Sequence, residues 1–138
     1  MDMTADWGEG RWREFALERL PEFADLVIAS RSDVDLWQNL KEFLADEGAM
    51  AANQDRARAI FEYAWWCITE CDDKMVAGQA EVSFYEDLPV YSDFHILVPI
   101  YITRSQFSRL EVAFRSSLSD DEYDEFKATY EAAISRHD

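Results

Sequence analysis

The chain contains few residues that interrupt helices, with only four glycines and three prolines among 138 residues. Because glycine and proline most often end helices and form turns, we expect helices to dominate the fold. The length is typical of one domain, and the apolar half of the sequence is enough to build a core. We therefore predict a compact all-α domain of about six or seven helices over residues 10–138, preceded by an acidic flexible tail over residues 1–9.

The spacing of apolar residues predicts where most of the helices lie. The clearest pattern runs from Asn53 to Asp72, where apolar residues recur every three or four positions, as on the buried face of a helix. Other helices are predicted from Arg11 to Leu20, from Pro21 through Val27, from Ser32 to a stop at Gly48, and through residues 81–85 to an end at Leu88-Pro89.

Two capping boxes predict where the last two helices begin. Thr103 is followed three residues later by Gln106, and Ser119 by Glu122. In such a pair each side chain accepts a hydrogen bond from the other residue's backbone N–H group, which satisfies two donors at the helix start. We expect one helix to begin after Thr103 and to continue to Leu118, and a second to begin after Ser119.

The segment over residues 90–102 has a conflicting pattern. Apolar residues alternate with others, as in a β-strand, at Phe94, Ile96, Val98, Ile100 and Ile102. Pro99 interrupts this run and disfavours a central strand, because proline cannot donate a backbone hydrogen bond. We expect an extended, partly buried connection, with a short edge strand at residues 94–102 as the alternative.

Four short motifs between residues 59 and 130 carry a resemblance to known sequences. They are Ile60-Phe61-Glu62-Tyr63-Ala64-Trp65-Trp66-Cys67, Phe84-Tyr85-Glu86-Asp87-Leu88-Pro89, Thr103-Arg104-Ser105-Gln106-Phe107 and Leu118-Ser119-Asp120-Asp121-Glu122-Tyr123. In these motifs the chain resembles a family of small, uncharacterised bacterial all-helical proteins. The resemblance implies a helical fold and a bacterial cytoplasmic origin, and it implies no catalytic residues.

Charge and composition exclude several classes of function. The chain has 29 acidic and 13 basic residues, for a net charge of −16. A generic nucleic-acid binder or a membrane-surface protein needs a basic face, which this chain lacks. The acidic N-terminus does not resemble a signal peptide, and no apolar run reaches the roughly 20 residues of a membrane span. We expect a reduced, cytoplasmic protein that binds neither nucleic acid nor membranes directly.

No motif of catalysis or metal binding is found in the sequence. Cys67 and Cys71 lie one helical turn apart, but a zinc site needs two more ligands, and neither His95 nor His137 has a recognised ligand spacing. The acids beside Cys71 should raise the pKa of its thiol and oppose nucleophilic reactivity. We predict no catalytic residue, metal or cofactor.

Two acidic clusters are the features most relevant to function. Five of the six residues over 120–125 are acidic, which the dipole of a helix start explains. Residues 70–87 contain six acids and one base, and the dipole explains this cluster less well. This cluster is either a solvated surface or a face that attracts a basic protein. The predicted partner-binding residues are Glu70, Asp72, Asp73, Glu86, Asp87 and the aromatic residue Tyr91.

These features favour an acidic binding module, such as an immunity-type or regulatory protein that neutralises a basic partner protein. The alternative is an enzyme or small-ligand-binding helical domain with a pocket that joins His95 to Glu81 or Tyr85. A homo-oligomer that buries exposed aromatic residues, such as Trp7 or Tyr91, is compatible with either hypothesis.

Overall fold

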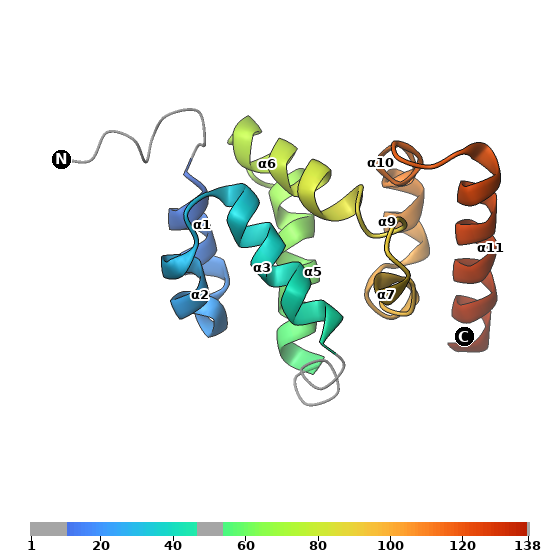
Figure 1. Cartoon of the computed structure of the whole chain (residues 1–138), viewed down its shortest axis with the longest axis horizontal. Coiled ribbons are helices and arrows are strands. Elements are labelled where there is room, and N and C mark those ends of the chain that lie inside the picture. The colour runs from blue at the N-terminus through green and yellow to red at the C-terminus, as the bar shows by residue number, and fades with distance from the viewer. Residues whose placement is uncertain (1–10, 47–53, 138) are drawn as a thin grey trace. The chain divides into compact units, whose positions relative to one another are not determined.

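The computed structural model describes residues 11–46 and 54–137, and all regular structure in these ranges is helical. The predicted all-α class is confirmed, although the described residues form more helices than the six or seven expected. The chain divides into two compact units, Met1–Ser83 and Phe84–Asp138, which we call the first and second units (Figure 1). The predicted acidic tail, Trp7 and the helix stop at Gly48 lie outside the described residues.

The first unit begins with α1 (Trp12–Arg19), followed by a short 3₁₀ turn that starts at a proline. Pro21 is the first residue of this turn, where its missing N–H group costs no helical hydrogen bond. Ser32 caps α3 as predicted, because its hydroxyl oxygen accepts the backbone N–H of Asp35 at 3.1 Å. The elements are α1 (Trp12–Arg19), the 3₁₀ turn η2 (Pro21–Phe23), α2 (Ala24–Ala29), α3 (Asp33–Ala45), α5 (Gln54–Thr69) and α6 (Lys74–Ala80).

The core of the first unit forms around α5, which packs against α6. The ring of Tyr63 stacks on Trp37 at 5.6 Å and on Trp66 at 6.2 Å between ring centroids. The guanidinium group of Arg19 lies over the Trp66 ring, 3.9 Å from its centroid. Most of the predicted apolar face of residues 53–72 is buried in this core, where aromatic rings pack beside aliphatic side chains.

A π-helical segment, η3 (Glu81–Tyr85), follows α6, and the boundary between the two units falls within it. The remaining helices belong to the second unit. They are α7 (Ser92–His95), α8 (Val98–Tyr101), α9 (Arg104–Arg109), α10 (Glu111–Arg115) and α11 (Asp120–His137).

The long helix α11 organises the core of the second unit, since it packs against α8 and α10. The ring of Phe107 lies 4.3 Å from that of Tyr130 and 5.7 Å from that of Phe126. The Tyr130 hydroxyl donates a hydrogen bond to the backbone carbonyl of Ile102 at 2.7 Å, which fixes the end of α8 against α11.

The expectation of an extended connection or edge strand over residues 90–102 is wrong. The segment instead forms the short helices α7 and α8. Phe94, Val98 and Ile102 are buried at helical spacing, whereas Ile96 and Ile100 are 63% and 46% exposed. The alternation in the sequence therefore arises because three of these apolar residues lie on a buried helical face and the other two are exposed. Pro99 lies in the first turn of α8, where proline is well tolerated.

Both capping boxes are confirmed. Gln106 N–H donates to the Thr103 hydroxyl at 3.2 Å, and Thr103 N–H donates to the Gln106 side chain at 2.9 Å. The Ser119 and Glu122 pair has the same two bonds at the same distances. The helix expected from Thr103 to Leu118 is divided into α9 and α10, because the backbone leaves α-helical geometry at Leu110.

Candidate functional site

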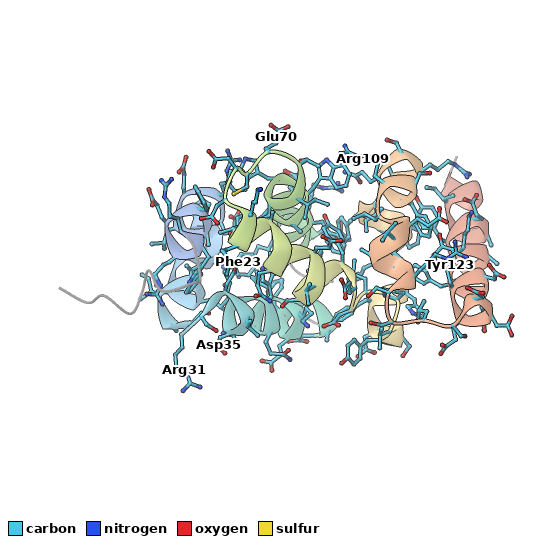
Figure 2. All side chains as sticks on the ribbon, turned by 90° about the horizontal axis from the view of Figure 1, so that it is seen from above. Phe23, Arg31, Asp35, Glu70, Arg109 and Tyr123 are labelled. Atoms are coloured by element: carbon cyan, nitrogen blue, oxygen red, sulfur yellow. The ribbon has the colours of Figure 1, made fainter. Side chains whose placement is uncertain are left out.

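The predicted partner-binding residues belong to different units. Glu70, Asp72 and Asp73 follow α5 in the first unit, whereas Glu86, Asp87 and Tyr91 lie in the second unit. Glu70 and Asp72 are exposed, and Figure 2 shows the Glu70 side chain extending away from the ribbon. We therefore treat the two groups as separate surfaces.

Asp73 has a structural role at the start of α6. One carboxylate oxygen accepts the backbone N–H groups of Met75 at 3.0 Å and Val76 at 3.4 Å. The other oxygen accepts the backbone N–H of Arg11 at 3.0 Å. The carboxylate thus caps α6 and ties it to the residue before α1, which leaves it less available to a partner than Asp72.

Glu86 and Asp87 lie in a turn over residues 86–90 that leads to Tyr91. The Glu86 carboxylate accepts a hydrogen bond from the Ser116 hydroxyl at 2.9 Å, which joins this turn to the loop between α10 and α11. The backbone carbonyl of Asp87 accepts the N–H of Val90 at 3.1 Å and closes the turn. Tyr91 is 54% exposed, with its ring edge-on to Phe94 at 6.0 Å.

A pocket of about 290 Å³ lies beside this turn, within the second unit. It is formed by this turn, by α7, by the loop before α11 and by α11 itself as far as Thr129. We call it the second-unit pocket, and its lining residues are Pro89, Val90, His95, Ser117, Leu118, Glu122, Glu125, Phe126 and Thr129.

Hydrogen bonds fix the polar side chains of the second-unit pocket. His95 Nε2 donates to the backbone carbonyl of Pro89 at 2.7 Å, and the His95 ring lies 5.2 Å from that of Phe126. The hydrogen bonds that Glu122 accepts from Ser119 lower the pKa of its carboxyl group, which is therefore ionised at neutral pH. The pocket thus combines a fixed imidazole, an ionised carboxylate and apolar walls.

Glu125 adds a second carboxylate to the pocket lining. This residue is exposed, and it forms no ion pair with any residue that the structure describes. Its carboxylate is therefore available to a ligand or a partner.

The combination of His95 with Glu81 or Tyr85 does not occur in this pocket. Tyr85 is buried and does not line it, and Glu81 belongs to the first unit. The pocket residues Glu122 and Glu125 were not among the predicted site residues. The spacing of these two glutamates predicts that they share a helix face with Thr129. The sequence does not show that residues 89–95 pack against this face, so the pocket itself could not be predicted.

A second pocket, of about 350 Å³, lies in the first unit around Phe23 and Arg56. The Arg56 guanidinium donates to the backbone carbonyl of Glu22 at 2.7 Å and lies over the Phe23 and Phe43 rings at 5.1 and 5.9 Å. The Arg56 guanidinium therefore ties η2 to α5, which is a structural role.

The cysteines have the properties of packed side chains. Burial raises the pKa of the Cys67 thiol well above its ordinary value. The pKa of the Cys71 thiol is also raised, first by burial and then by Asp73 and Asp72. Within residues 11–46 and 54–137, no group of three or more His, Cys, Asp or Glu residues is placed to hold a metal ion.

In the same parts of the chain, no helix is both long and apolar enough to span a bilayer.

Comparison of the chain with protein-family models, curated proteins and solved structures finds no match. The resemblance over residues 59–130 therefore stays a prediction.

Proposed function

We propose that this chain is an acidic protein-binding module that binds and neutralises a basic partner protein, in the manner of an immunity or regulatory protein. The observation that carries the proposal is the presence, within the second unit, of unpaired carboxylates together with exposed apolar side chains. Water solvates the carboxylates well. Burial of the exposed apolar side chains against a partner is favourable, because it removes their apolar surface from water.

The apolar part of this surface follows the turn over residues 86–90. Val90, Tyr91 and Ile96 are 44%, 54% and 63% exposed. Tyrosine is enriched at the centres of protein interfaces, where it supplies a large contact area at a small entropic cost. Tyr91 is therefore the proposed aromatic anchor.

The charged part of this surface lies on α11. Asp121, Asp124 and Glu125 form no ion pair with any described residue. Uncompensated carboxylates attract a basic partner over distances of about a Debye length, roughly 10 Å at 0.1 M salt. Such steering increases association rates more than it increases affinity. Glu70 and Asp72 add exposed negative charge on the first unit and remain proposed contacts there.

A quantitative pull-down from the native host tests this proposal. The bait is the full chain, compared with an α11 variant (Asp121→Asn, Asp124→Asn, Glu125→Gln) and a first-unit variant (Glu18→Gln, Glu42→Gln, Glu62→Gln). Each variant removes three exposed negative charges. We expect one basic protein to be captured at low salt and lost at high salt, and its capture to fall only for the α11 variant.

Two results would count against the proposal. Empty eluates at both salt concentrations would contradict the existence of a basic partner. Equal losses for both variants would show that only the total charge matters, and would contradict the placement of the site on the second unit.

A further inference from the structure

Resting on the proposed function, we infer that the second-unit pocket accepts one arginine side chain of the basic partner. The pocket offers apolar walls and two carboxylates, and its volume of about 290 Å³ suits a single side chain better than a larger ligand. An arginine side chain in this pocket would anchor the partner at one defined point, which long-range charge attraction alone does not do.

The apolar walls match the stem of an arginine side chain. Val90, Leu118 and Phe126 line the pocket, and Val90 is 44% exposed while Phe126 is buried. Arginine buries its methylene groups along apolar surface while its charged head stays at a polar edge. An arginine in this pocket would thus cover apolar surface that now faces solvent.

The carboxylates match the guanidinium head. Glu122 and Glu125 lie three residues apart on α11, and neighbours at this spacing project from the same side of a helix. One Glu122 oxygen accepts the Ser119 N–H at 2.9 Å, which holds that side chain in place. Glu125 forms no ion pair with any residue in the described ranges, so it can accept two parallel hydrogen bonds from a planar guanidinium.

Other occupants fit these residues less well. An anionic ligand would be repelled by both carboxylates, and an uncharged apolar ligand would desolvate them without compensation. The ammonium group of lysine lacks the planar fork that pairs with a carboxylate through two bonds. Arginine alone among the side chains combines the apolar stem with that fork.

The test is an NMR titration of the ¹⁵N-labelled full chain with N-acetyl-arginine methylamide. We expect saturable shifts of the amide signals of Val90, His95, Ser117 and Glu125. Glu125→Gln should weaken binding by about tenfold, because a bidentate charged hydrogen bond is lost. Asp121→Asn is the matched control, since it removes the same charge from the same helix outside the pocket, and it should change binding by less than about twofold.

Two further probes separate shape from charge. N-acetyl-citrulline methylamide has nearly the same shape as the arginine probe but carries no charge. N-acetyl-lysine methylamide carries the charge but lacks the planar guanidinium group. We expect no saturable shifts with citrulline and weaker binding with lysine. Equal weakening by Glu125→Gln and Asp121→Asn would overturn the inference, as would equal binding of arginine and citrulline.

This titration fails or succeeds independently of the proposed function. If arginine binds in the pocket while the pull-down yields no basic protein, the proposed function is wrong and the pocket assignment stands. If a basic protein is captured through the α11 acids while arginine does not shift the pocket signals, the arginine inference is wrong and the proposed function stands.

Discussion

At the residue scale, adjacent acids in this chain have different roles. Asp73 accepts hydrogen bonds from the backbone N–H groups of Met75, Val76 and Arg11, whereas the neighbouring Asp72 is exposed. The sequence indicated only that both are acidic residues in a turn. The distinction depends on which carboxylate faces the start of α6, and on a contact with Arg11 that lies 62 positions away.

Replacing Asp73 should therefore destabilise the protein. We expect Asp73→Ala to lower the free energy of unfolding by about 1–2 kcal/mol, the usual cost of losing a helix N-cap. Asp72→Ala should change it by less than about 0.5 kcal/mol, because that side chain is on the surface. Urea unfolding followed by circular dichroism measures both values. Equal effects of the two substitutions would show that the cap does not stabilise the fold.

At the element scale, local signals predicted the capped starts of helices better than they predicted the short helices. The capping boxes at Thr103 and Ser119 are confirmed because they depend only on residues three positions apart. Helices α7 and α8 were missed because their short length provides less than two turns of periodicity. Their helical form becomes evident only from the packing of α8 against α11.

The capping box of α11 has a pH-dependent consequence. The hydrogen bonds from Ser119 lower the pKa of Glu122 in the folded protein. A carboxyl group with a lowered folded pKa stabilises the protein above its unfolded pKa of about 4.3, and this contribution is lost as the pH falls through the folded value. Ser119→Ala removes the hydroxyl but keeps the backbone N–H, which is the larger cause of the lowered pKa. We therefore expect this variant to raise the Glu122 pKa only part of the way toward the ordinary value, measured by NMR titration of the side-chain carboxyl carbon.

The control is Ser108→Ala, because Ser108 lies on α9 and takes no part in this capping box. This variant should leave the Glu122 pKa as it is in the parent chain. An unchanged Glu122 pKa in Ser119→Ala would contradict the account of this helix start.

At the scale of the whole molecule, the sequence predicted part of the candidate site. Glu86, Asp87 and Tyr91 were predicted, and they lie in or beside the turn that contributes Pro89 and Val90 to the second-unit pocket. In the sequence, the capping box and the helix dipole explain Glu122, and the dipole alone explains Glu125. Their second role was not predictable, because it requires α11 to pack beside a turn about 30 residues earlier in the chain.

The most direct test of the account is the rate at which the purified basic partner associates with the chain, measured at low and high salt. We compare the parent chain with the α11 variant and the first-unit variant, which carry the same net charge. At low salt we expect the α11 variant to associate at least about tenfold more slowly than the parent chain, and the first-unit variant to stay within about twofold of it. At high salt the three rates should converge. Equal association rates of the α11 variant and the parent chain at low salt would contradict the account.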